Sequence, residues 1–269
     1  MTGEMWLQHT HLDKLYGYLP GMADALPLIF GMSRVEYRDI IARYDARARE
    51  AAEGMLADEA FAARVDALPV QPGQTILAIG DSITDDLQSW AEILRHLLDP
   101  RGVRVVNGGL SAHTTAMVLR RWPATLGAAR PDWVICGLGG NDVTRVGPDA
   151  AKPQVSLHES VANLRELRRI GGAVAGWVWM TPVPVIEERV AASPMFGFSQ
   201  VAWRNPDIVA LAGEIKGFAD PVVDLTATFG VPARQDLQGA DGVHPSLEGQ
   251  MAITRSFVER LAGGATSFL

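Results

Sequence analysis

Three side chains that together can perform nucleophilic catalysis occur in two short polar segments. Ser82 follows the apolar run at residues 75–79, and Asp241 lies three residues before His244. A serine hydroxyl is a poor nucleophile until a base takes its proton, and an imidazole can do so near neutral pH. A carboxylate in a loop that contains Gly242 can reach the far ring nitrogen and fix its tautomer. The spacing therefore predicts acyl transfer, with Ser82 as nucleophile, His244 as base and Asp241 as the orienting residue.

Acyl transfer also builds negative charge on the carbonyl oxygen of the substrate, and hydrogen-bond donors must meet that charge. The candidate donors are the backbone N–H groups of Ser82 and Gly109 and the side-chain amide of Asn141. Asp81 is predicted to hold the turn beside the nucleophile, and Asp142 is predicted to be structural. The expected oxyanion hole therefore consists of Ser82, Gly109 and Asn141.

These side chains need a scaffold that brings them to one edge. From residue 74 onward, short apolar runs alternate with helix-like segments, which is typical of a parallel sheet covered by helices on both faces. In such sheets ligands lie beyond the carboxyl ends of the strands, so the polar segments that follow the runs are expected to share one rim. Strands are expected at residues 75–79, 103–106, 133–136, 174–180 and 222–225, and helices near residues 90–97, 116–122, 157–169 and 206–218 and from 245 onward.

Four short motifs, in this order along the chain, resemble the signature blocks of SGNH/GDSL hydrolases. They are Gly80-Asp81-Ser82, the glycine at 109, Gly139 with Asn141 and Asp142, and Asp241 with His244. The similarity covers roughly residues 74–262. It implies a flavodoxin-like three-layer α/β/α sandwich with a five-stranded parallel sheet. It also implies the roles given above: nucleophile Ser82, base His244, orienting residue Asp241 and oxyanion donors Ser82, Gly109 and Asn141. The family often has a second glycine three residues after the first, and this chain has Ala112 there.

Residues 1–70 lie outside the motifs and are predicted to form an N-terminal helical extension, with the hydrolase domain at residues 71–269. A capping box at Ser33 and Glu36 opens one helix, and Asp58 is placed to cap a second that ends near residue 66. Residues 1–32 show no clear period. The extension could cap the pocket, form a dimer contact or stabilise the core, and the sequence leaves these roles open.

Other patterns give weaker indications of a site. His9 and His11 are two residues apart but lack a third ligand, so no metal is expected. The glycines at 137–140 lack the third glycine of a dinucleotide-binding loop, so no organic cofactor is expected. The segment at residues 181–206 is long and apolar, and it is expected either to complete the core or to form a wall of the substrate pocket.

The bulk composition agrees with a soluble enzyme. The net charge is −7, which argues against a nucleic-acid partner, and the single cysteine, Cys136, is expected to be buried. No signal peptide and no apolar stretch long enough to span a bilayer is evident, so a cytoplasmic location is expected, with the oligomeric state open. The predicted function is serine esterase action on a small-molecule ester. The alternatives are an acyltransferase that uses the same acyl-enzyme and, less favoured because Ser82 and His244 are both present, a non-catalytic binding module.

Overall fold

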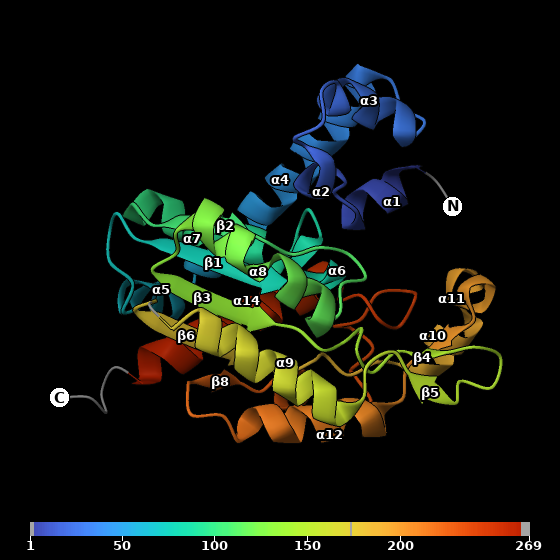
Figure 1. The fold of residues 1–269 in the computed structure, drawn as a ribbon. Coiled ribbons are helices and arrows are strands. Elements are labelled where there is room, and N and C mark those ends of the chain that lie inside the picture. The colour runs from blue at the N-terminus through green and yellow to red at the C-terminus, as the bar shows by residue number, and fades with distance from the viewer. Residues whose placement is uncertain (1–2, 173, 265–269) are drawn as a thin grey trace.

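The centre of the molecule is a parallel β-sheet. In the computed structural model, which describes residues 3–172 and 174–264, the strands lie side by side in the order β2-β1-β3-β6-β8 (Figure 1). All four neighbouring pairs run parallel. With helices on both faces, this arrangement confirms the expected three-layer fold around a five-stranded parallel sheet. The strands are β1 (Thr75–Gly80), β2 (Arg104–Asn107), β3 (Trp133–Gly137), β6 (Gly176–Met180) and β8 (Val222–Val223).

Both faces of the sheet are apolar, because the strands are continuous apolar runs whose successive residues point to opposite sides. In β1, Ile76 and Ala78 pack in one buried cluster, whereas Leu77 and Ile79 pack in another. Cys136 in β3 belongs to the second cluster and is fully buried, as predicted. The sheet therefore separates two apolar cores.

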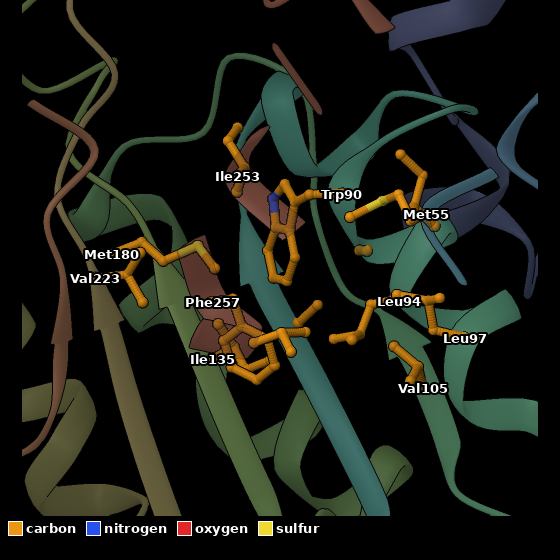
Figure 2. Close-up of a cluster of buried hydrophobic side chains, with 14 of the residues drawn as sticks. Met55, Trp90, Leu94, Leu97, Val105, Ile135, Met180, Val223, Ile253 and Phe257 are labelled. Atoms are coloured by element: carbon orange, nitrogen blue, oxygen red, sulfur yellow. The ribbon is translucent and has the colours of Figure 1, made fainter. Parts of the chain in front are cut away.

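Two sets of helices cover these cores. On one face α7 and α14 pack against the strands, and Figure 2 shows Trp90 and Phe257 from these helices beside Ile135 of β3. On the other face lie α8, α9 and α12. The helix α8 continues past its predicted end near Trp122, because Pro123 is accommodated inside it. The bounds are α6 (Ser82–Asp85), α7 (Trp90–Leu98), the 3₁₀ turn η1 (Asp99–Arg101), α8 (Thr115–Ala129), α9 (Leu157–Ile170), α12 (Asn205–Lys216), α13 (Leu225–Phe229) and α14 (Leu247–Gly264).

The N-terminal part of the chain is helical, as expected. The predicted capping box is present, since Ser33 and Glu36 each accept a hydrogen bond from the other's backbone N–H. The helix α4, which this box opens, packs on α7, and the next helix, α5, packs on α14. Three short helices precede them, within the part of the chain that showed no period. In chain order, the three short helices are α1 (Gly3–His9), α2 (Asp13–Tyr16) and α3 (Met22–Ile29), and the two helices after them are α4 (Arg34–Leu56) and α5 (Glu59–Asp66).

The long segment after β6, at residues 181–206, forms short regular elements. It contains two short helices and a strand that joins a small antiparallel sheet with two strands from the segment after β3. Trp203 follows that strand, and its Nε1 donates to the carbonyl of Gly140 at 2.8 Å. The segment is therefore attached to the loop that carries Asn141. Its elements are α10 (Glu187–Ala192), α11 (Pro194–Ser199) and β7 (Val201–Ala202), which pairs with β4 (Arg145–Val146) beside β5 (Lys152–Pro153).

Candidate active site

Ser82 lies where β1 turns into the four-residue helix α6. Asp81 caps this helix, because its Oδ1 accepts the N–H of Ile83 at 3.1 Å, which is the turn-holding position that the sequence predicted for it. Burial raises the pKa of Asp81 to about 6. Ser82 itself is 9% exposed, so a small part of its side chain reaches the adjoining cavity.

His244 and Asp241 form a closed turn that points toward Ser82. Gly242, with φ of 78°, allows the turn, and one carboxylate oxygen of Asp241 accepts the N–H groups of Val243 and His244, both at 2.9 Å. The other oxygen lies 2.6 Å from His244 Nδ1. On the opposite side of the ring, Nε2 lies 2.9 Å from Ser82 Oγ. The structure thus brings together the three residues that the sequence singled out, although 162 positions separate Ser82 from His244.

Asp241 and His244 each stabilise the charged form of the other. Burial disfavours the ionised carboxylate of Asp241, but the hydrogen bond and charge of His244 outweigh burial and hold the pKa of Asp241 below its usual range. Burial likewise disfavours the protonated imidazole, but Asp241 outweighs it, with smaller contributions from Asp86 and Asp81, so the pKa of His244 is raised. The site therefore favours a carboxylate beside a basic imidazole.

Asn141 lies on the loop after β3 and lines the same cavity as Ser82 and His244. Its Nδ2 has one long hydrogen bond, 3.4 Å, to the carbonyl of His113, which leaves a second N–H available. Asp142 is fully buried and accepts from Thr115 and Ser160, so it holds this loop in place, as predicted.

Gly109 is not placed as the sequence suggested. Its N–H donates to Asn107 Oδ1 at 3.0 Å, and it is not among the residues that line the cavity. A side chain at 109 would meet the backbone of Asp85 at 2.6 Å, so the glycine is required by close packing. Ala112 lines the cavity instead, with φ of 61°, and its N–H has no protein acceptor among the described residues. The pattern that could have pointed to it is the second family glycine, because position 112 is where that glycine is expected.

The cavity beside Ser82 has a volume of about 300 Å³ and a mainly apolar lining. The segment at residues 181–206 forms much of its wall and also contributes buried residues to both apolar cores, so it has both of the roles expected for it. Phe196 and Trp203 pack edge to face there, with ring centroids 4.9 Å apart. The apolar residues that line the cavity include Leu138, Val183, Val185, Met195, Phe196 and Trp203.

Two residues of the N-terminal extension also reach the site, which agrees with pocket capping, one of the roles left open for the extension, although neither residue was singled out for it. Trp6 of α1 lines the cavity, and the ring of His9 stacks on that of His244. His11, which was paired with His9 as a weak metal candidate, instead lies 2.8 Å from Asp85 through its Nδ1. The two histidines therefore have separate partners.

Within the described residues, no helix is long and apolar enough to cross a membrane. The chain is similar to known esterases. The chain is 30% identical to Esterase TesA of Pseudomonas aeruginosa over 184 residues, which cover 66% of this chain and 82% of the relative. It is 29% identical to an acetylxylan esterase of Geobacillus stearothermophilus over 220 residues, which cover 72% of this chain and 96% of the relative.

Solved structures show the same architecture. The crystal structure of Axe2, an acetylxylan esterase from Geobacillus stearothermophilus, superposes with a TM-score of 0.54 at 26% identity, covering 71% of this chain and 95% of the other. A lipase/acylhydrolase from Enterococcus faecalis shares the fold at 22% identity, with a TM-score of 0.57 and coverage of 71% and 96%. The sequence model of the GDSL-like Lipase/Acylhydrolase family matches residues 78–252. The chain therefore belongs to the GDSL-like Lipase/Acylhydrolase family and is an ester-hydrolysing enzyme.

Proposed function

We propose that the enzyme hydrolyses carboxylic esters through an acyl intermediate on Ser82. The observation that carries the proposal is the continuous chain of hydrogen bonds from Ser82 Oγ through His244 to Asp241, beside an apolar cavity. The three side chains have the geometry required of a nucleophile, its base and the group that orients the base.

In the first half-reaction, His244 Nε2 takes the proton of Ser82 as Oγ bonds to the carbonyl carbon of the ester. Asp241 stabilises the imidazolium that forms. The tetrahedral intermediate then collapses, the carbon–oxygen bond to the alcohol breaks, and His244 gives its proton to the departing oxygen. In the second half-reaction water loses a proton to His244 and attacks the acyl carbon. Release of the carboxylic acid returns that proton to Ser82 Oγ.

A fluorophosphonate probe tests this assignment directly, because it phosphonylates a base-activated serine with loss of fluoride. We expect one adduct per chain on the peptide that contains Ser82, detected by mass spectrometry. Ser82→Ala should give none, while Ser193→Ala, outside the cavity, should be labelled like the wild type. An adduct on another residue would reject Ser82. Product analysis with an added acceptor alcohol separates hydrolysis, which yields free acid, from acyl transfer, which yields a new ester.

Three donors are available for the negative charge on the carbonyl oxygen. They are the N–H of Ser82, the N–H of Ala112 in place of Gly109, and the side-chain amide of Asn141. All three residues line the cavity. A preorganised donor acts mainly on the transition state, because the charge is largest there.

Asn141→Ala is expected to lower kcat by about 10²- to 10³-fold with little change in KM, since the lost donor stabilises the transition state. Steady-state kinetics on p-nitrophenyl butyrate measure both constants. Asn141→Asp, which keeps the shape but replaces the donor by an oxygen, should fall at least as far. A variant in which KM rises and kcat is unchanged would show that Asn141 only binds substrate.

The apolar cavity favours short and medium acyl chains. We expect kcat/KM on p-nitrophenyl esters to rise from acetate to butyrate, because each buried methylene contributes about 0.8 kcal/mol, and to fall at palmitate once the cavity is full. Met195→Trp should fill the cavity and move the optimum to a shorter chain. Phe198→Trp, on the same helix α11 but 90% exposed, is the matched control and should leave the profile unchanged. A steady rise up to palmitate would mean an open groove instead.

A further inference from the structure

The N-terminal extension is anchored at the edge of the sheet that holds Ser82. The carbonyl of Gln8 accepts the N–H of Leu87 at 3.0 Å, and Gln8 Nε2 donates to both carboxylate oxygens of Asp86 at 3.2 and 3.1 Å. Lys14 Nζ lies 2.6 Å from Asp85. Because Asp85 ends α6 and Asp86 follows it, these bonds fix the first helices directly beside the nucleophile (Figure 1).

The anchored segment carries His9 onto the face of His244. The two ring centroids are 4.4 Å apart and the planes differ by 26°, so the imidazoles are stacked. Both ring nitrogens of His244 are hydrogen-bonded, Nδ1 to Asp241 and Nε2 to Ser82. These two bonds hold the ring in its own plane, but neither prevents it from tilting toward the side that His9 covers.

The His9 side chain makes no hydrogen bond among the described residues. Its side chain is 20% exposed, and Nδ1 is buried without a hydrogen bond, with the nearest carboxylate oxygen of Asp86 at 3.7 Å. Burial lowers the pKa of His9 to about 3, with a further contribution from His244 that the nearby carboxylates of Asp241 and Asp85 only partly offset. His9 is therefore an uncharged aromatic ring at any pH at which His244 can act as a base.

We infer that His9 is a positioning residue, whose stacked ring keeps the imidazole of His244 in the orientation in which Nε2 meets Ser82 Oγ. The inference rests on the role proposed above for His244. An uncharged ring suits this position, because His244 becomes positively charged in each transition state and a cation beside it would oppose that charge. In this view α1 is part of the active site, with Trp6 at the cavity and His9 on the base.

The test compares substitutions of His9 in the full chain. His9→Ala is expected to lower kcat on p-nitrophenyl butyrate by about 10- to 100-fold, because a small misplacement of a catalytic group has a large effect on rate. KM should change by less than about threefold, since His9 holds the base and not the substrate. His9→Phe, which restores a flat uncharged ring, should recover most of kcat. Met5→Ala, on the same helix and exposed, should match the wild type.

The pH profile gives a second readout that loss of stability alone would not move. Without the ring, water reaches His244 and favours its protonated form, so the acid limb of kcat/KM should move to higher pH in His9→Ala and stay in place in His9→Phe. Wild-type kcat and profile in a folded His9→Ala enzyme would overturn the inference. If His9→Ala does not fold, His9→Phe and His9→Leu decide, because equal kcat in these two would show that only bulk matters. An active Ser82→Ala enzyme would instead remove the proposed function itself.

Discussion

Ser82→Ala is expected to lower kcat by about 10⁵- to 10⁶-fold, because among the described residues that line the cavity Ser82 is the hydroxyl hydrogen-bonded to His244. His244→Ala should be nearly as severe, since the hydroxyl then has no base. The double variant should be no worse than the more severe single variant, because the two residues act as one unit. Stopped assays with p-nitrophenyl butyrate at high enzyme concentration measure these residual rates.

The matched controls separate loss of chemistry from loss of fold. Removing the Ser82 hydroxyl leaves His244 Nε2 without its partner, which should lower the free energy of unfolding by only about 1 kcal/mol. Thermal melts of Ser82→Ala and Ser193→Ala should therefore be close to that of the wild type. A Ser82→Ala enzyme that retains more than about a hundredth of kcat would contradict a mechanism in which removal of the nucleophile costs about 10⁶-fold.

The residues on the hydrogen-bonded chain were predictable because local rules determine their positions. Ser82 follows a strand, and the carboxyl ends of parallel strands share one rim, so its meeting with His244 follows from topology. The turn from Asp241 to His244 follows from the left-handed conformation of Gly242. In both cases the residues beside the reactive side chain, a strand before Ser82 and Gly242 before His244, also determine the local backbone conformation.

The position of Gly109 was predicted less well, because a glycine in a motif does not show where its N–H points. Asn107 directs its side chain onto the N–H of Gly109, a contact between residues two positions apart that composition cannot reveal. Ala112 has the positive φ expected of a glycine, although alanine rarely adopts it. The glycine pattern therefore pointed to Gly109, whereas the residue of this turn that lines the cavity is Ala112.

The N-terminal contribution to the site was not predictable from periodicity. The helix α1 has seven residues and α2 has four, which is too short for an amphipathic pattern to repeat. Such short helices are marginal on their own, and here contacts of Gln8 and Lys14 with the main fold hold them. The stacking of His9 on His244 depends on those contacts, so it becomes visible only in three dimensions.

Asp241→Asn is expected to lower kcat by about 10³- to 10⁴-fold, although asparagine has nearly the same shape. The amide oxygen can still accept the backbone N–H groups of Val243 and His244, so the turn should persist. The amide nitrogen then faces His244 Nδ1, which must become an acceptor. The ring proton moves to Nε2, and a protonated Nε2 cannot take the proton of Ser82.

The same substitution should shift the pH dependence. Catalysis needs His244 neutral, so kcat/KM rises with pH as the imidazole loses its proton. Asp241 raises the pKa of His244, so its replacement by a neutral amide lowers that pKa and moves the acid limb to lower pH. Asp236→Asn on the same loop, exposed and paired with Arg234, is the control and should change neither rate nor profile. If Asp241→Asn kept kcat within about tenfold of the wild type, far from the 10⁴-fold loss of a mis-set tautomer, Asp241 could not be the residue that orients the base.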